Sequence, residues 1–394
     1  MKRVLITGAG LAGSVLARAL AERGVASWVI DRRPHAAGMC HSARDEETGV
    51  MVHRFGPHIF HTSHERVWEF VNRFDAVFPC ISKFRAVNRH GVFSMPINLH
   101  TINQLFGKTM TPAEARAFIE TKQDRSIVSP RNAEEQLLRF VGREIYEAFF
   151  EGYTTKQWGV PPCGLPASIV KRIPVRFTYD DNYYFSKYQG FPMSGYTELI
   201  RRMLDHELIS VSLLTAYEHA MAAEFEHVFF SGPLDEYFAY AEGPLGYRTV
   251  SFRAERGEGD LQGVGCLNYT ELSVPFTRGH EDKYFSPWER HEKSVVMYEY
   301  SREAGVEDDR FYPKRMARDM EILSRYLERA ERLGNVSFIG RLGCYRYLDM
   351  DEVIRLSLEY ADKWLAWREG RAASPGRFAV SPADSGIETP LRRG

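Results

Sequence analysis

The sequence lacks an excess of charge, a long apolar run and the cysteine spacing of a disulfide framework. It has 51 lysines and arginines against 52 acidic residues, a net charge of −1, which favours neither nucleic acid nor an anionic membrane as a partner. No apolar run approaches the ~18 residues of a membrane-spanning helix, and the first residues lack the apolar core of a signal peptide. We therefore expect a cytoplasmic protein without nucleic-acid or membrane partners, whose anion sites are built locally.

The five cysteines are odd in number and widely spaced, without a CxxC pair. This spacing argues against disulfides and against a zinc site. His58 and His61 could suggest a metal, but no carboxylate or thiol stands at ligand spacing, so we predict none. With 394 residues, the chain is long enough for two or three domains.

The clearest motif lies in the first thirty residues. An apolar strand, a glycine turn, an amphipathic helix ending near Gly24 and a second strand ending at Asp31 follow one another. Gly8, Gly10 and Gly13 form G-x-G-x-x-G in this strand-turn-helix context. The glycines allow a pyrophosphate to approach the helix N-terminus, and Asp31 stands where an acid can bind a ribose hydroxyl. The motif predicts dinucleotide binding.

The chain then leaves the βα alternation that an NAD enzyme would continue. Residues 33–62 are rich in Gly, His and Pro. Beyond them we predict helices over 112–122, 132–143 and 143–151, strands within 84–96 and 246–300, and a return of the α/β pattern at 227–233 and 336–343, followed by a helix from about Met350 to Trp367. A dinucleotide domain assembled from separated segments is typical of FAD proteins. Asp349 and Glu352 resemble a capping pair that would point the last helix at a flavin, although an ordinary cap explains them equally well.

Aromatic residues stand beside cations at several places. In FFEGYTTKQWG (149–159), Phe150, Tyr153 and Trp158 could stack on a base, or equally pack a helix end. Arg172, in LPASIVKRIPVRFTYDDNYYF, is a strong candidate for a phosphate contact, because guanidinium binds phosphate bidentately. Lys171 and Arg176 are as well explained by solvation or by pairing with Asp180 and Asp181. Further tyrosines and arginines, namely Arg278, Tyr312, Arg341, Tyr345 and Tyr347, suggest a polyphosphate and sugar, although a single tyrosine is more often a hydrogen-bonded core residue.

Together these stretches closely resemble the bacterial UDP-galactopyranose mutase family, from about Val4 to Trp367. The motifs that carry the resemblance include GAGLAGSVLA, RFGPHIFHT, FSMPINLHTINQLFGK, EAFFEGYTTKQWG, LPASIVKRIPVRFTYDDNYYF, SPWERHE and GRLGCYRYLDM. The resemblance implies an isomerase that interconverts UDP-galactopyranose and UDP-galactofuranose, with N5 of reduced FAD as nucleophile at the anomeric carbon. It also implies NADPH or another reductant to prime the FAD, a nucleotide-diphosphate sugar as substrate, and a homodimer.

The implied fold class is α/β, or α+β overall, with three domains. A discontinuous Rossmann-like FAD-binding domain would comprise 1–79, 190–243 and 318–370. A helical domain with a mobile substrate loop would span 100–175, and an antiparallel sheet domain would comprise 80–99, 176–189 and 244–317. The Pro/Ser/Gly-rich tail, 371–394, is expected to be disordered.

The resemblance also implies site residues. The catalytic residues are Arg172 and Arg278, which clamp the diphosphate, and His58 and His61, beside the flavin. The substrate-binding residues are Phe149, Phe150, Tyr153, Thr154, Trp158, Arg172, Tyr183, Asn268, Arg278, Tyr312, Tyr347, Asp349 and Ser82. The cofactor-binding residues are Gly8, Gly10, Leu11, Ala12, Gly13, Asp31, Arg32, Gly38, Met39, His58, Ile59, Arg341, Tyr347, Asp349 and Met350.

Two segments depart from the family pattern. Residues 37–41, Ala-Gly-Met-Cys-His, replace the usual Gly-Gly-Asn and the residues after it against the flavin. Residues 80–83, Cys-Ile-Ser-Lys, replace Tyr-Val-Asn-Arg, whose asparagine contacts the sugar. Because the shorter Ser82 has fewer hydrogen-bond options, the accepted sugar can differ. The alternatives are the same ring contraction on dTDP-fucose or UDP-N-acetylgalactosamine, a flavin oxidoreductase, and a non-catalytic nucleotide-sugar binder.

Overall fold

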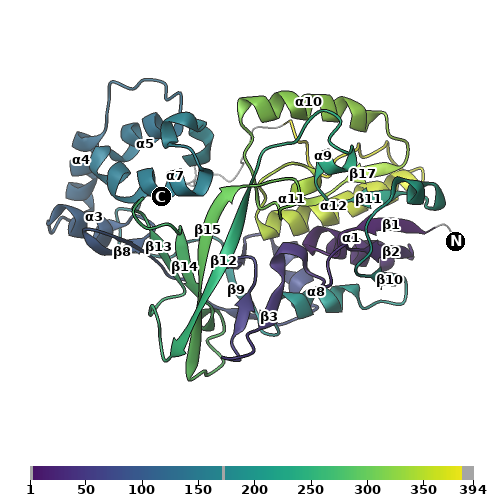
Figure 1. Cartoon of the computed structure of the whole chain (residues 1–394), viewed down its shortest axis with the longest axis horizontal. Coiled ribbons are helices and arrows are strands. Elements are labelled where there is room, and N and C mark those ends of the chain that lie inside the picture. Colours follow the sequence, from purple (N-terminus) through teal and green to yellow (C-terminus); the bar gives the residue numbers. More distant parts are fainter. Residues whose placement is uncertain (1–2, 171–173, 384–394) are drawn as a thin grey trace.

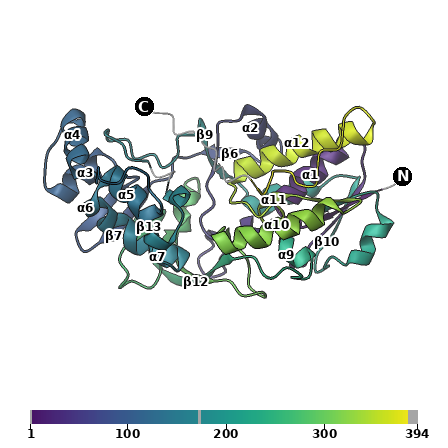
Figure 2. The same cartoon turned by 90° about the horizontal axis from the view of Figure 1, so that it is seen from above.

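The structure is a computed structural model that describes residues 3–170 and 174–383. Two large sheets and a group of helices make up the fold (Figure 1). The helical group lies at one end and a parallel sheet with its helices at the other, while the long strands of the second sheet run between them, as the view from above also shows (Figure 2). The predicted α/β class is confirmed.

The parallel sheet is assembled from distant parts of the chain. Its order is β10 (Ile209–Ser212), β2 (Ser27–Ile30), β1 (Val4–Thr7), β11 (Val228–Phe230) and β17 (Val336–Phe338), and every pair is parallel. The α/β pattern that returns late in the sequence therefore forms β11 and β17. Because β1 is central, the glycine turn that follows it lies at the middle of the sheet's carboxyl edge.

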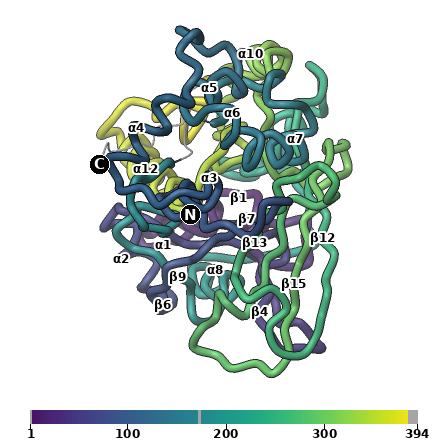
Figure 3. The backbone as a smooth tube through the Cα atoms, turned by 90° about the vertical axis from the view of Figure 1, so that its left-hand side faces the viewer, coloured from purple at the N-terminus to yellow at the C-terminus, as the bar shows by residue number. Residues whose placement is uncertain are grey.

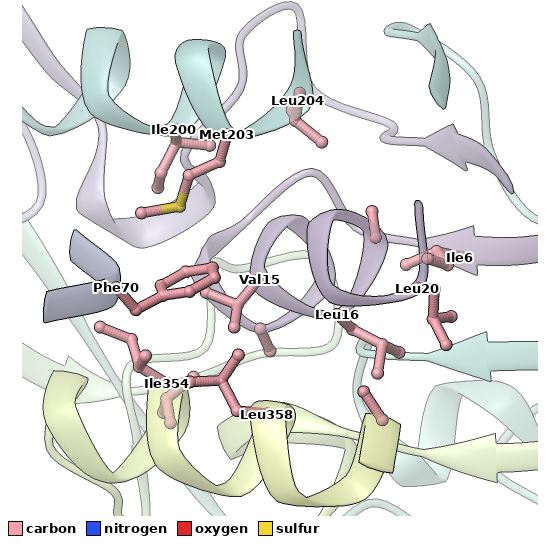
Figure 4. Close-up of a cluster of buried hydrophobic side chains, with 14 of the residues drawn as sticks. Ile6, Val15, Leu16, Leu20, Phe70, Ile200, Met203, Leu204, Ile354 and Leu358 are labelled. Atoms are coloured by element: carbon pink, nitrogen blue, oxygen red, sulfur yellow. The ribbon is translucent and has the colours of Figure 1, made fainter. Parts of the chain in front are cut away.

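Both faces of this sheet are covered. Helices α1 (Leu11–Ala21), α8 (Tyr196–Leu204) and α12 (Met350–Arg368) form one core with β1, and α1 packs between the other two (Figure 4). Helix α10 (Ala317–Glu331) covers the opposite face. Leu5 belongs to the second core whereas Val4 and Ile6 belong to the first, because successive side chains of a strand point to opposite faces. Burial on both faces explains why β1 is wholly apolar up to Thr7.

The second sheet has seven strands and is antiparallel except for one pair. Its order is β16 (Tyr312–Pro313), β12 (Tyr247–Glu258), β15 (Lys293–Glu303), β14 (Arg278–Glu281), β13 (Cys266–Tyr269), β7 (Phe84–Asn88) and β8 (Gly91–Met95). Only β13 and β7 pair in parallel. The tube view shows how far β12 and β15 extend along each other (Figure 3). Arg278 is the first residue of β14, next to β15.

The helical group contains α3 (Leu99–Phe106), α4 (Pro112–Lys122), α5 (Ala133–Val141) and α6 (Arg143–Ile145), followed by a π-helical turn, Tyr146–Phe150, and α7 (Glu151–Trp158). The predicted helix over 112–122 is confirmed, and α5 ends at Gly142, whose φ of 81° stops it. The predicted helix over 143–151 is longer than expected. Helical structure continues through the π turn to Trp158 and ends at Gly159, in a left-handed conformation.

Smaller elements connect the two sheets. Strands β3 (Ser42–Arg44) and β4 (Met51–His53) pair, and β5 (Phe60–Thr62), β9 (Tyr188–Pro192) and β6 (Val77–Pro79) form a three-stranded sheet. The described fold also contains the short helices α2 (Glu65–Asn72), α9 (Leu234–Tyr237) and α11 (Gly340–Gly343) and several 3-10 turns. The segment between β4 and β5, which carries His58, is thus fixed at both ends. No helix of the described residues is long and apolar enough to cross a membrane.

Two local predictions need correction. Residues 371–383 were expected to be disordered, but the main chain of Arg377 and Ala379 hydrogen-bonds Phe338 of edge strand β17, and Phe378 stacks on Phe338 with ring centres 5.1 Å apart. This contact covers an exposed strand edge. Asp349 is the N-cap of α12 but makes no capping hydrogen bond, and Glu352 instead pairs with Arg355. The remaining tail residues, 384–394, lie outside the described part.

Candidate active site

The glycine turn after β1 has the shape of a phosphate cradle. A Cβ at Gly13 would stand 2.0 Å from the carbonyl oxygen of Gly8, so only glycine lets α1 pack onto the turn. Gly8 has a φ of +94°, in the left-handed region. Gly10, the N-cap of α1, offers no side-chain cap, and among the described residues a Cβ placed on it would have only Gly38 atoms within 4 Å. The free N–H groups of α1, beginning at Leu11 and Ala12, are thus available to an anion.

Asp31 and Arg32 have partners at the end of β2. The Asp31 carboxylate accepts hydrogen bonds from the backbone N–H groups of Ala9, at 2.8 Å, and Arg33, at 2.9 Å. It therefore ties the glycine turn to the second strand. Arg32 pairs with Glu236 at 2.9 Å. Their expected contacts with a cofactor remain predictions.

The unusual segment at 37–41 lies against the turn and the start of α12. Ala37 pairs with Gly10 in a parallel bridge and adopts a left-handed φ of 77°. The Cys40 sulfur lies 3.8 Å from that of Met350. Burial raises the pKa of the Cys40 thiol to about 11, against the opposing influence of Arg341. This segment thus brings the turn, α11 and α12 together where a dinucleotide would extend.

Arg278 is the centre of a second cluster. It faces Glu299 across β14 and β15, and its Nε lies 2.8 Å from Glu299 Oε1. Burial disfavours the guanidinium charge, but Glu299, Tyr153 and Tyr312 outweigh it and raise the pKa of Arg278 well above its usual value. The guanidinium therefore stays positive. Asn268 stands beside it on β13.

Four predicted tyrosines surround this guanidinium. Tyr153 on α7 and Tyr312 on β16 interact with Arg278, and Tyr312 and Tyr347 have ring centres 5.6 Å apart. The charges of Arg278 and Asp349 also act on Tyr183: Arg278 lowers the pKa of its hydroxyl and Asp349 raises it. Burial raises the pKa of each of these tyrosines, so all four hydroxyls keep their protons at neutral pH. They can donate hydrogen bonds to an anion.

Arg341 adds a second cation. Its guanidinium lies 6.0 Å from the ring centre of Tyr312. The positive charge of Arg341 also lowers the pKa of two groups, the Cys40 thiol on one side and the Tyr347 hydroxyl on the other. It therefore stands between the 37–41 segment and the Arg278 cluster.

The two predicted histidines have different surroundings. The His58 Nδ1 lies 2.7 Å from the Gly56 carbonyl, and burial together with His53 lowers the pKa of His58 to about 3. His58 is therefore neutral at physiological pH. His61 stacks on Tyr184 with ring centres 3.7 Å apart, and its Nδ1 lies 3.0 Å from Ser186 Oγ. The charges of Arg341 and Arg278 also lower the pKa of His58, which therefore lies near both guanidinium groups.

Five other predicted residues are buried or partly buried. Phe149 and Phe150 are buried in the helical core, where Phe149 meets Phe93 edge to face. Thr154 is buried on α7, and Trp158 packs at the edge of the same core. Ser82 is 7% exposed, and its hydroxyl has no hydrogen-bond partner among the described residues. Such an orphan is uncommon and fits an absent ligand group.

The structure describes residues 165–170 and 174–185 of the segment that contains Arg172. Arg172 and Lys171 fall outside the described residues. Arg176 is buried, pairs with Asp180 at 3.3 Å and donates to the carbonyls of Asp180 and Asn182. Its guanidinium also lies 4.1 Å from the ring centre of Phe185. Arg176 is therefore a structural centre of this loop, as pairing with an acidic neighbour predicted.

One group of described residues has metal-ligand atoms close together, and it does not include His58 or His61. His64, Asp351 and Glu352 place one ligand atom each within 4.8 Å of one another at the start of α12. Glu352 already pairs with Arg355 and with His64 at 3.3 Å. Two of the three groups, His64 and Glu352, therefore already have ion-pair partners.

The sequence analysis missed the polar groups behind Arg278. Glu299, His280 and Asp282 are buried beside it, and His53 is buried next to His58. Glu299 follows Val295 and Met297 at alternate positions, so a charge in line with apolar residues could have indicated it, because such a charge needs a partner. The register that identifies Arg278 as this partner is not visible in the sequence.

Comparison with known proteins agrees with this geometry. The UDP-galactopyranose mutase family model matches residues 148–347, and that of an NAD(P)-binding Rossmann-like domain matches residues 6–74. A probable UDP-galactopyranose mutase of Klebsiella pneumoniae is 52% identical over 365 residues, covering 93% of this chain and 95% of that protein. A dTDP-fucopyranose mutase of Escherichia coli is 44% identical over 372 residues, covering 93% and 99%. A crystal structure of reduced UDP-galactopyranose mutase shares the fold, with a TM-score of 0.71, 16% identity and coverage of 93% and 96%.

A Rossmann-like nucleotide-binding part, joined to a partly exposed cluster of arginines and tyrosines, defines an α/β enzyme with a dinucleotide site. The matches are more specific, because two relatives above 40% identity span nearly the whole chain. The chain belongs to the UDP-galactopyranose mutase family and is an isomerase.

Proposed function

We propose that this enzyme uses reduced FAD to interconvert the pyranose and furanose forms of a nucleotide-diphosphate sugar, with UDP-galactose as the first candidate. The observation that carries the proposal is Arg278, whose side chain is 19% exposed, held positive by Glu299 and lying near four protonated tyrosines. Such a group can bind a diphosphate and stabilise the charge that develops as the diphosphate leaves.

The residues at the glycine turn fit FAD. The uncapped N-terminus of α1 and the space at Gly10 suit a pyrophosphate, and the 37–41 segment leads from there to Arg341 and Met350. When bound and reduced, FAD would supply the nucleophile for the anomeric carbon. A yellow purified protein with a flavin absorption spectrum tests this part, and a protein that stays colourless after FAD addition would contradict it.

The protein's own share is binding and orientation. Arg278, with Arg172, would clamp the diphosphate, and Tyr153, Tyr183, Tyr312 and Tyr347 would donate hydrogen bonds to it. Because His58 is neutral, it would not attract the diphosphate away from the two arginines. Phe149 and Phe150 of the π-helical turn, Tyr153, Thr154 and Trp158 of α7, and Asn268 of β13 would form the base and sugar pocket.

Arg278→Lys tests the clamp. A point charge cannot reproduce the bidentate contact, so we expect a loss of about tenfold or more in kcat/KM on dithionite-reduced enzyme. The loss should appear in kcat as well as KM if the contact strengthens while the diphosphate leaves. Unchanged kinetics would refute the assignment of Arg278 to the diphosphate.

A second candidate substrate is a dTDP-linked 6-deoxy sugar. The orphan hydroxyl of Ser82, where the family has asparagine, and the 44% identity to a dTDP-fucopyranose mutase both favour it. Product chromatography with UDP-galactose and dTDP-fucose in parallel separates the two candidates. If Ser82→Asn with Cys80→Tyr raises the rate on UDP-galactose, the native pocket is adapted to another sugar, and a lower rate favours galactose.

We further propose that the enzyme is a homodimer, on the basis of the family resemblance. Light scattering of the purified protein tests this, and a monomeric mass that does not change with concentration would contradict it.

A further inference from the structure

A run of buried polar groups lies behind Arg278 and extends to His58. Glu299, which pairs with Arg278, also lies 3.9 Å from the Nε2 of His280. The other ring nitrogen of His280 lies 2.5 Å from Asp282 Oδ1. The side chains of His280 and Asp282 are fully buried, and that of Glu299 is 3% exposed.

The same carboxylate of Asp282 reaches the histidine segment. Its Oδ2 accepts a hydrogen bond from the backbone N–H of His53 at 2.8 Å. The His53 ring nitrogen Nδ1 then accepts one from the backbone N–H of His58 at 3.2 Å. The groups therefore form a continuous series from Arg278 through Glu299, His280, Asp282 and His53 to His58.

Gly56 provides a second contact between the two ends. A Cβ at Gly56 would lie 3.2 Å from Glu299 Oε1 and 3.7 Å from a terminal nitrogen of Arg278, so the ion pair packs directly on this glycine. The Gly56 carbonyl in turn holds the His58 ring at 2.7 Å. A shift of the Glu299–Arg278 pair would therefore press on the backbone that carries His58.

Stability alone does not explain this series. Burying charged groups is costly, and replacing a buried ion pair by apolar residues is often neutral or stabilising. His280 Nε2 and Glu299 Oε1, moreover, have no hydrogen-bond partner with good geometry among the described residues. Buried and incompletely satisfied polar groups are concentrated at functional sites. Neighbouring Glu281, by contrast, is fully engaged with Ser294 and the backbone of residues 261–263.

We propose that His280 and Asp282 are positioning residues that hold Glu299, and through it the Arg278 guanidinium, in register with the His53–His58 segment. This inference rests on the proposed function, in which Arg278 binds a diphosphate, and on the expectation from the family resemblance that His58 lies beside the flavin. Neither His280 nor Asp282 touches substrate. They fix the distance between the phosphate-binding group and the histidine segment, so that both ends of the site are set by one buried unit.

The test measures UDP binding to the purified flavoprotein by calorimetry. His280→Gln and Asp282→Asn are each expected to weaken UDP binding about tenfold, because Glu299 and Arg278 lose their fixed orientation. Both should also shift the flavin absorption band, since the His53–His58 segment moves. Asp45→Asn is the control: Asp45 is 2% exposed and pairs with Arg256 at 2.7 Å near the far end of β12. It should bind UDP like the parent.

A double-mutant cycle separates positioning from general destabilisation. In an Arg278→Lys background, His280→Gln should weaken UDP binding further by less than about threefold, because the group that it positions is already altered. A merely structural role would leave the full tenfold effect in both backgrounds. If His280→Gln does not fold, Asp282→Asn answers the same question with nearly unchanged shape.

The outcomes distinguish this inference from the proposed function. If the parent does not bind UDP, or if Arg278→Lys binds it equally well, the assignment of Arg278 to the diphosphate fails. If Arg278→Lys weakens binding while His280→Gln and Asp282→Asn behave like Asp45→Asn, the proposed function stands and the positioning role is refuted. Full additivity in the cycle also refutes it.

Discussion

The packing of the glycine turn allows two neighbouring glycines to be separated by experiment. A Cβ at Gly13 would lie 2.0 Å from the Gly8 carbonyl oxygen and 3.1 Å from Ile6 Cγ2, so the helix or the turn must move by about 1 Å to reach the usual 3 Å. A Cβ at Gly10 would have no neighbour nearer than the Gly38 Cα, at 3.8 Å. A side chain at Gly13 would therefore disturb the packing of the protein without any ligand, whereas a side chain at Gly10 would interfere only with a bound pyrophosphate.

The magnitudes follow from these contacts. Overpacking costs about 1–3 kcal/mol, and a contact with backbone belongs at the upper end because no side chain can move aside. Alanine recovers up to ~1 kcal/mol of helix propensity at position 13. We expect Gly13→Ala to destabilise the flavin-free protein by about 1–2 kcal/mol. Gly10→Ala should stay within ~1 kcal/mol of the parent, since the helix loses only a preferred N-cap residue.

Urea unfolding of the flavin-free proteins and titration with FAD measure the two effects separately. Both variants should bind FAD more weakly, Gly13→Ala because the turn is displaced and Gly10→Ala because its methyl group occupies the approach of the pyrophosphate. A Gly13→Ala protein that is as stable as the parent would refute the packing argument. Equal destabilisation by both substitutions would show that the space at Gly10 has been misjudged.

Three further predictions concern other parts of the chain. Burial lowers the pKa of His227 to about 4, below the ~6.5 of the unfolded chain, so the contribution of neutral His227 to the free energy of unfolding is complete above pH 6.5 and is lost as the pH falls. Between pH 7.5 and 5.5, the free energy of unfolding of the parent, measured in urea, should therefore fall by about 1.3 kcal/mol more than that of His227→Gln. Arg176→Ala should expose the 176–185 loop to limited proteolysis, whereas Arg172→Ala should leave proteolysis unchanged and lower kcat/KM about ten- to a hundredfold. Lys156→Met leaves three backbone carbonyls without their donor and should cost about 1–3 kcal/mol in thermal unfolding, while Lys156→Arg recovers part of it.

Local motifs were the part of the structure that could be predicted. The strand, glycine turn and helix at the N-terminus are encoded within thirty residues, and α4 begins at a Thr111–Glu114 capping box. The π-helical turn at Tyr146–Phe150 was not predictable in this way, because its wider hydrogen bonding has no short sequence signature and places Phe149 and Phe150 in the core.

Contacts between distant segments could not be derived from composition. The tail has the composition of a disordered segment. Phe378 nevertheless stacks on Phe338, forty positions earlier, and the backbone on either side of Phe378 hydrogen-bonds the edge strand β17. Arg278 was predicted from its aromatic neighbours and from the family resemblance. Its partner Glu299, however, depends on the pairing of β14 with β15, a register that only the assembled sheet determines.

The charges around Arg278 nearly cancel, so binding of a diphosphate is expected to need a further cation from another part of the chain. Arg278 and Arg341 contribute two positive charges, and Glu299 and Asp349 contribute two carboxylates that act on the same tyrosines. His58, with a pKa of about 3, adds none at neutral pH. A cluster with no net charge gains little from long-range attraction to a diphosphate dianion. A further cation must therefore approach when substrate binds, and Arg172 is the residue that we predict to supply it. UDP affinity of the parent should accordingly fall more steeply with salt than that of Arg172→Ala, and equal salt dependence of the two proteins would remove Arg172 from the site.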